Sequence, residues 1–165
     1  MNVINSIKAI IILSTDGRRT LVKYYDEQMQ SNSKLDFEKK LYSKTKSPKA
    51  KDEIIELDGV LVVHKFITDS HIYVVGDRNE NPLVLDSVLS CLVEIFNSLS
   101  SNVIGGNLVH DNSSRVVLAL DEICDSGMIL ETDPNLVLQR ITATNQEDFE
   151  SVSRTAKRFG NWFGI

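Results

Sequence analysis

Residues 7–27 read IKAIIILSTDGRRTLVKYYDE, and this stretch sets the pattern for the first half of the chain. The β-branched run from Ile7 to Leu13 predicts a buried strand, and Asp16-Gly17 is typical of a turn. Thr20 to Tyr25 supplies a return strand. The stretch therefore predicts a β-hairpin with Asp16-Gly17 near its tip.

The next part of the chain continues with alternating strand and helix signals. The expected elements, in order, are a helix over Lys34–Thr45, a short strand over Ile54–Leu57, a hairpin of Val60–Ile67 with Ile72–Val75, and a helix that begins at Pro82 and runs to about Leu99. The apolar residues of that last helix cover most of its circumference, which indicates burial on more than one side. A helix packed on an antiparallel sheet makes the fold class α+β.

The second half of the chain has mostly helical signals. The expected elements are a short or irregular piece over Val103–Val109, a helix over Ser114–Cys124 with Val117, Leu120 and Cys124 on one face, a stop at Asp125-Ser126-Gly127, an extended Met128–Leu130, a helix over Asn135–Ile141 with Asp133 as cap and Pro134 at its first position, and a polar linker over Thr142–Gln146. We expect one domain over residues 1–142 and a helical tail over 143–165.

The tail has the clearest amphipathic pattern. An apolar seam repeats at spacings of 3, 4, 3 and 4, and two further apolar residues follow near the end; the seam is Phe149, Val152, Ala156, Phe159 and Phe163, joined by Trp162 and Ile165. Three interpretations stay open: packing on the chain's own domain, docking on a partner protein, or lying on a membrane surface. As partner-binding residues the pattern favours Phe149, Val152, Phe159, Trp162 and Phe163.

Composition limits the classes of function. The formal net charge of −5 argues against a partner held through nucleic-acid phosphates. The two cysteines, Cys91 and Cys124, lie in apolar segments and are expected to be reduced in a cytoplasmic protein. The apolar run before Asp16 is shorter than a signal-peptide core, and no stretch of about 20 apolar residues predicts a membrane span. The basic loop Lys44–Lys51 fits a solvated loop better than a lipid contact.

A search for catalytic patterns finds none, so we expect no enzyme, no cofactor, no metal and no small-molecule substrate. His64 and His71 flank the second turn and could suggest a metal or acid–base site, but surface or half-buried strand histidines are expected instead. Cys124 with His110 could suggest a nucleophile and its base, yet a buried inert thiol fits better. The adjacent Asp121 and Glu122 point about 100° apart on a helix and are not expected to cooperate.

Several segments together resemble the zeta subunits of coatomer, relatives of the small sigma subunits of clathrin adaptors. They are IKAIIILSTDGRR at 7–19, KYYD at 23–26, FEKK at 37–40, LDGVLVVHK at 57–65, IYVVG at 72–76, ENPLVLDSVLSCL at 80–92 and LALDEICDSGMILETDP at 118–134. KYYD and the last segment favour zeta over sigma. Asp125-Ser126-Gly127 departs from the Asp-Gly-Gly common in the family, and the tail matches it only as a terminal amphipathic segment.

The resemblance implies a longin-like fold, in which a five-stranded antiparallel sheet lies between helices. It implies a non-enzymatic structural subunit of the COPI vesicle coat that pairs with the N-terminal trunk of the gamma subunit in the F-subcomplex, alongside the other coatomer subunits. Such a subunit is cytoplasmic, is recruited to Golgi membrane with the coat through the GTPase Arf, and serves retrograde Golgi-to-ER and intra-Golgi transport. The alternatives are a sigma subunit that recognises cargo sorting signals and a longin module that acts on a small GTPase.

The many β-branched and leucine positions also suggest apolar surface left over after the domain closes its own core. Such surface is typical of a permanent interface. We therefore expect the chain to need a partner protein.

Overall fold

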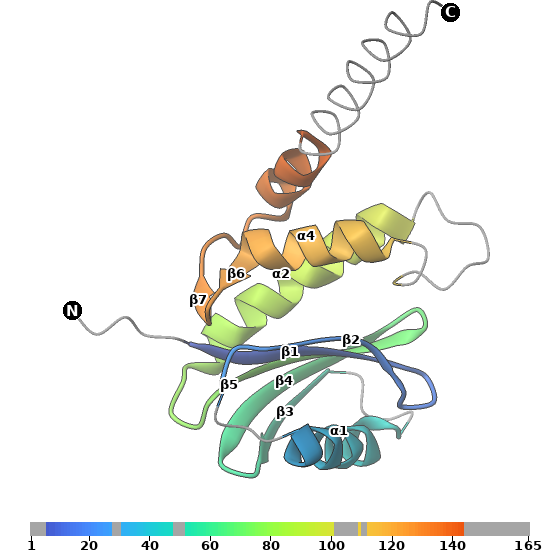
Figure 1. Ribbon diagram of the computed structural model, residues 1–165, viewed down its shortest axis with the longest axis vertical. Helices are drawn as coiled ribbons and strands as arrows, with labels where there is room; N and C mark the ends of the chain where they lie inside the picture. Colours follow the sequence, from blue (N-terminus) through green and yellow to red (C-terminus); the bar gives the residue numbers. More distant parts are fainter. Residues whose placement is uncertain (1–5, 28–30, 48–51, 101–108, 110–111, 144–165) are drawn as a thin grey trace, which may run out of the picture.

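The computed structural model describes residues 6–27, 31–47, 52–100, 109 and 112–143. Its elements are β1 (Ile7–Ser14), β2 (Arg19–Tyr24), α1 (Ser31–Thr45), β3 (Asp52–Leu57), β4 (Val60–Ile67), β5 (Ser70–Asp77), α2 (Pro82–Ser100), α4 (Ser113–Ile123), β6 (Cys124–Asp125) and β7 (Met128–Ile129). The sheet lies between α1 on one face and α2 with α4 on the other (Figure 1). This confirms the predicted α+β class with a five-stranded antiparallel sheet between helices.

The five strands lie in the order β2-β1-β5-β4-β3, so β1 is flanked on both sides and β2 and β3 form the edges. Ile11 pairs with Val22 on β2 and with Tyr73 on β5. Because successive side chains point to opposite faces and both faces carry helices, the middle of a flanked strand is apolar on both sides, as in β1 from Ala9 to Leu13. Ile10 accordingly packs in the core beneath α2, and Ile11 packs in the core beneath α1.

The two hairpins of the sheet form where the sequence predicts them. In the first, Gly17 has φ +80 and the backbone N–H of Gly17 donates to the carbonyl of Ser14 at 2.9 Å. A Cβ at Gly17 would lie 2.6 Å from the ring of Tyr42 on α1, so this turn requires glycine for space as well as for conformation. The tip of the first hairpin is thereby joined to α1.

The helix α2 is the centre of the larger core. It begins where predicted, and the side-chain oxygen of Asn81 accepts a hydrogen bond from the backbone N–H of Leu83 at 3.0 Å. Its length and hydropathy would allow a membrane span, but its buried face packs over β4 and β5. That face contains Leu85, Val88, Leu89, Cys91, Leu92, Ile95, Phe96 and Leu99. Burial in the protein core thus accounts for its hydrophobicity.

The region around Cys124 differs from the prediction. α4 ends at Ile123, and Cys124 instead begins β6, where it pairs with Ile129 of β7. The chain reverses there because Ser126 and Gly127 both have positive φ, at 50 and 83, so the expected helix stop is a hairpin turn. Val117 is also exposed; the buried stripe of α4 is Val116, Ala119, Leu120 and Ile123.

Residues 134–143 are helical and complete the described chain. The cap is confirmed, because the Asp133 carboxylate accepts from the backbone N–H of Asn135 at 2.9 Å. Thr142 and Ala143 continue the helix where a polar linker was expected, and the Thr142 hydroxyl donates to the carbonyl of Leu138 at 2.8 Å. Most of the expected piece over Val103–Val109 lies outside the described residues; Val109 itself is buried.

Candidate interaction surfaces

The thiols and carboxylates that could suggest catalysis are held in inert positions. Cys91 and Cys124 are both buried, and burial raises the pKa of Cys91 to about 11 and also raises that of Cys124. Neither thiol is therefore ionised at neutral pH. His110, the suggested base for Cys124, lies outside the described residues. Asp121 pairs with Lys23, whereas Glu122 pairs with Arg140, so the two acids serve separate contacts as predicted.

His64 and His71 are buried, not surface or half-buried as predicted. Their side chains point to the α1 face of the sheet, where the Nε2 atom of His64 lies 3.0 Å from the Nδ1 atom of His71. His64 stacks on the ring of Tyr73 at 4.8 Å between centroids, and the ring of Tyr42 meets His71 edge-on at 5.6 Å. The sequence pattern did not predict this burial because the two histidines flank a turn, and only the packing of α1 on this face of the sheet buries them.

This histidine cluster has the properties of a structural core. Burial lowers the pKa of His71, which keeps the ring neutral near pH 7. Within the described residues, no group of three or more histidine, cysteine, aspartate or glutamate side chains could hold a metal ion. The hydroxyls of Tyr73 and Thr45 lie 2.6 Å apart and tie the end of α1 to β5. The cluster therefore anchors α1 on the sheet.

A hollow of about 590 Å³ at the tip of the first hairpin is lined partly by Arg18 and Arg19. Both guanidinium groups already have carboxylate partners. Arg18 pairs with Asp16, whose pKa is lowered to about 2 by hydrogen bonds from Ser14 and then Arg18. Arg19 donates to both carboxylate oxygens of Glu38 at 2.6 and 2.7 Å. Arg18 therefore holds the turn of the hairpin, and Arg19 joins the hairpin to α1.

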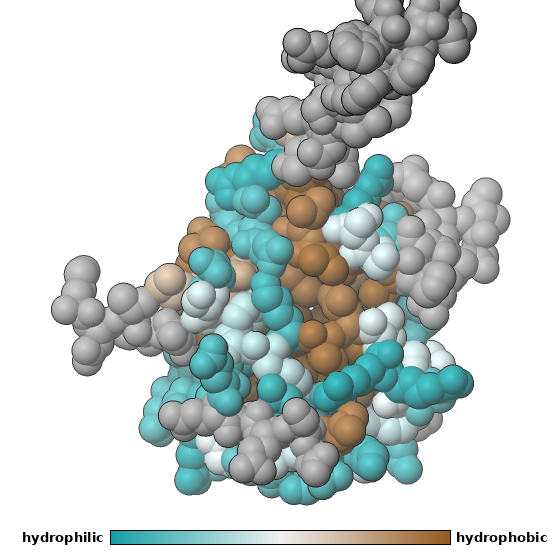
Figure 2. Space-filling model, in the orientation of Figure 1, coloured by the Kyte–Doolittle hydropathy of each residue, from teal (hydrophilic) through white to brown (hydrophobic). Residues whose placement is uncertain are grey.

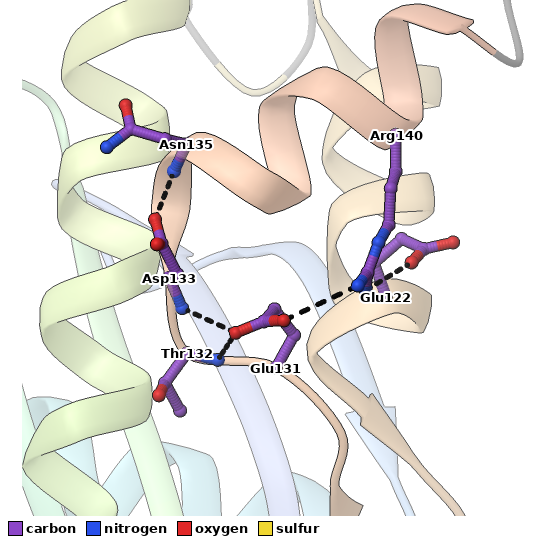
Figure 3. A network of polar contacts seen from close by, with 6 residues as sticks. All are labelled: Glu122, Glu131, Thr132, Asp133, Asn135 and Arg140. Atoms are coloured by element: carbon purple, nitrogen blue, oxygen red, sulfur yellow. Dashed lines mark hydrogen bonds and ion pairs between the residues drawn. The ribbon is translucent and has the colours of Figure 1, made fainter.

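A polar network fixes the helix of residues 134–143 (Figure 3). One carboxylate oxygen of Glu131 accepts from the backbone N–H groups of Thr132 and Asp133, both at 3.0 Å. Its other oxygen lies 3.5 Å from the guanidinium of Arg140, which also reaches Glu122 on α4 at 3.3 Å. Arg140 thus bridges the loop, the last described helix and α4.

This network explains the MILETDP segment at 128–134, which the sequence marked only by resemblance. Glu131 organises the turn, Asp133 caps the helix, and Pro134 occupies its first position, as expected for a start signal. Val137 and Ile141 are buried on the inner side of that helix. The predicted partner-binding residues Phe149, Val152, Phe159, Trp162 and Phe163 lie outside the described residues.

Apolar side chains remain on the surface of the described domain. Figure 2 shows a band of hydrophobic residues over the helical layer and the sheet, between hydrophilic flanks. The large hydrophobic side chains that are exposed are Leu35, Ile54, Phe66, Leu83, Val117, Leu130 and Leu136. Ile54 and Leu83 share a groove between β3 and α2. The sequence held one signal for this groove, the paired Ile54-Ile55 in an edge strand, since the two side chains must face opposite sides.

The sequence comparisons identify relatives of the chain. Residues 6–148 match the family described as "Clathrin adaptor complex small chain". Coatomer subunit zeta-2 of Homo sapiens is 37% identical over 164 residues, which cover 95% of this chain and 77% of that protein. Coatomer subunit zeta-3 of Arabidopsis thaliana is 39% identical over 150 residues, 89% of this chain and 83% of that protein.

The fold also matches a chain in a homology model of the full-length AP-3 complex in a stretched open conformation. The TM-score is 0.67 at 16% identity, over 90% of this chain and 98% of that chain, which shows a shared fold. The sequence matches are with subunits of coat and adaptor complexes, a non-enzymatic class of protein. The chain belongs to the clathrin adaptor complex small chain family.

Proposed function

We propose that the chain is the zeta-type small subunit of the COPI coat and pairs with the N-terminal trunk of the gamma subunit. The observation that carries this proposal is the 35–39% identity to coatomer zeta subunits over about nine-tenths of the chain. The AP-3 chain shares the fold at only 16% identity. The fold is common to coatomer zeta and adaptor sigma subunits, whereas the sequence identity is higher to the zeta subunits. The sequence identity therefore favours the zeta role over the sigma role.

In this role the chain acts in the F-subcomplex as a structural part of the coat. It is cytoplasmic, and it reaches the Golgi membrane peripherally, when Arf recruits the whole coat. The transport routes are then retrograde Golgi-to-ER and intra-Golgi. The surface of the domain supports a structural role, because exposed leucine, isoleucine and phenylalanine side chains suit a protein partner.

The tail is a second proposed contact with the partner. Residues 143–165 follow the domain of residues 1–142, and the seam of Phe149, Val152, Phe159, Trp162 and Phe163 would supply the apolar contacts. Deletion of residues 147–165 tests this. Lost binding to the partner with unchanged thermal stability supports docking, whereas lost thermal stability of the domain alone supports packing on its own surface.

Affinity purification of the tagged chain from cytosol, with mass spectrometry of the large chains recovered with it, tests the main proposal. Stoichiometric gamma-coatomer with the other coat subunits is the expected result. Recovery of an adaptin would replace the zeta role with a sigma role that reads cargo signals. Recovery of no large chain, together with faster nucleotide release from a small GTPase, would favour the longin-module alternative.

Solubility gives an independent check on the need for a partner. We expect the chain made alone to self-associate or precipitate, because its exposed apolar side chains lack their cover. Co-expression with the gamma trunk should restore a soluble heterodimer. A monodisperse, highly stable monomer in size-exclusion chromatography would contradict this expectation.

A further inference from the structure

The groove between β3 and the first half of α2 holds the two most exposed large hydrophobic side chains of the described residues. Leu83 is 73% exposed and Ile54 is 66% exposed. The groove measures about 270 Å³, and its walls include Leu89 of α2 and Lys65 of β4. We refer to it as the Ile54–Leu83 groove.

The position of α2 over the sheet explains why Ile54 is exposed. Ile54 pairs with Val63, so both side chains lie in one row on the same face. Val63 is only 2% exposed and lies in the core beneath α2. Because α2 packs over β4 and β5, this hydrophobic row continues one strand further than its helical cover. β3 is therefore an edge strand with an apolar residue on an open face, where a single isolated domain would favour a charge.

The size of the groove distinguishes between kinds of occupant. Pockets for small molecules typically enclose about 300–1,000 Å³ and bury most of their ligand. At about 270 Å³ this groove lies at the low end of that range, and two of the side chains that line it, Ile54 and Leu83, are mostly exposed. It suits one or two apolar side chains inserted by a protein partner better than a bound metabolite.

The charges on α2 indicate which charge a partner segment should carry. The charged residues of α2 are Asp86 and Glu94, eight positions apart, and both are exposed. The helix contains no lysine, arginine or histidine. Asp86 lines the groove on the side of α2, while Lys65 lines it on the side of the sheet. A partner segment therefore matches the groove best when a lysine or arginine beside its apolar residue faces α2.

We propose that the Ile54–Leu83 groove receives a hydrophobic side chain of the large coat subunit, next to a lysine or arginine that meets Asp86. This inference rests on the proposed function and adds the contact surface to it. The groove would then be a second contact site for the large subunit, in addition to the tail.

Binding of the full chain to the recombinant N-terminal trunk of the gamma subunit, measured by isothermal titration calorimetry, tests the groove. Ile54→Asp and Leu83→Asp should each weaken binding roughly tenfold or more. Leu35→Asp is the matched control, because Leu35 is also exposed but lies on α1, and it should change binding by less than about twofold. Thermal unfolding of each variant shows whether the domain is still folded.

A charge reversal tests the basic neighbour separately. Asp86→Lys should weaken binding, and this loss should shrink at high salt because salt screens the repulsion. Asp36→Lys on α1 is the control, since it makes the same charge change at an exposed site away from the groove. Equal effects of the two reversals would overturn the assignment of the basic residue to Asp86.

A cross-link identifies the occupant directly. Leu83→Cys can be labelled with a benzophenone maleimide, because the native Cys91 and Cys124 are buried. At saturating trunk, a cross-link to a trunk peptide with an apolar residue beside a lysine or arginine supports the proposal. A cross-link to a second copy of the chain, or none at all, overturns it.

The outcomes separate the two proposals. If the wild-type chain fails to bind the trunk, the proposed function and this inference fall together. If the wild-type chain binds but Leu83→Asp binds equally well, only the inference about the groove falls.

Discussion

The two faces of the sheet are closed in different ways. On the α1 face, one helix is held at defined points by buried polar groups. Glu38 is 4% exposed and accepts hydrogen bonds from Arg19 and from the hydroxyl of Tyr24, and Thr45 meets Tyr73. On the α2 face the core is apolar and larger, and its cover stops before Ile54. Both faces keep some exposed apolar side chains, such as Leu35 and Phe66 on the α1 side, but the two most exposed ones, Leu83 and Ile54, lie at the edge of the α2 face.

The difference has a physical basis. Directional hydrogen bonds fix the position of α1 closely, because a buried polar group that lacks its hydrogen-bond partner destabilises the fold. Hydrophobic burial is non-directional, and its free energy grows with the apolar area removed from water. Exposed apolar side chains beside a core therefore favour contact with the apolar surface of another protein. The α1 face therefore specifies its own geometry, and the α2 face is the better candidate for contact with another chain.

Truncation in the apolar core should have the largest effect on this comparison. Phe96 of α2 is 2% exposed and packs in the core beneath that helix. Phe96→Ala should lower the free energy of unfolding by about 3–5 kcal/mol through lost burial and a residual cavity. Urea unfolding followed by circular dichroism measures this. A loss of under about 1 kcal/mol would mean that the α2 face is loosely packed.

Removal of the polar anchor on the other face should cost less. Glu38→Ala leaves Arg19 and Tyr24 without their shared acceptor and should lower the free energy of unfolding by about 1.5–3 kcal/mol. The expected loss of stability is moderate because the Arg19 side chain is 40% exposed, so its guanidinium group can be hydrated when Glu38 is absent. Glu38→Gln keeps one carbonyl oxygen as acceptor and should cost less than Glu38→Ala in the same urea titration.

Acid should weaken the α1 face through His71. Burial lowers the pKa of His71, so the folded state resists a proton that the unfolded state accepts near pH 6.5. The contribution of neutral His71 to the free energy of unfolding is therefore fully present above about pH 6.5. It declines as the pH falls from there through the lowered pKa of the folded state. The rings facing His71 are His64, Tyr42, Phe66 and Tyr73.

Urea unfolding at about pH 7.5 and about pH 5 measures this decline. His71→Phe removes one titrating group, so the variant should lose less stability between the two pH values than the wild-type chain. Equal losses in both proteins would show that His71 does not govern the acid response.

The smallest effect is expected at the rim of the α2 face. Leu83 is mostly exposed, so Leu83→Ala should change the free energy of unfolding by no more than about 0.5 kcal/mol. Leu85→Ala, two residues away but fully buried, should cost about 2–5 kcal/mol in the same assay. A large loss for Leu83→Ala would show that the domain itself needs this side chain.

Much of the fold could be predicted from local sequence. The five strands of the sheet and α1 and α2 occur where predicted, with bounds shifted by a few residues at most. These segments succeed because their periodicity is strong and their turns contain residues suited to positive φ or to caps, such as Gly17 and Asn81. The family resemblance, carried by segments spread over the chain, is likewise confirmed.

The errors in the prediction come from contacts between distant segments. Cys124 continues the apolar pattern of α4, yet a turn at Ser126-Gly127 places it in a strand. Val117 fits a helical face by spacing, but α4 is rotated so that Val117 is exposed on the side where Asp121 meets Lys23. Periodicity gives the repeat of a stripe and leaves open which way the stripe faces.

The sequence by itself determined most of the secondary structure, the α+β class and the family, because strand alternation, helix periodicity and turn chemistry are local properties of the chain. Only the tertiary structure decided which apolar residues stay uncovered. Ile54 and Ile55 are neighbours with identical side chains, yet one is 66% exposed and the other is 9% exposed. Burial depends on which helix crosses which strand, and this is set by the packing of the whole domain.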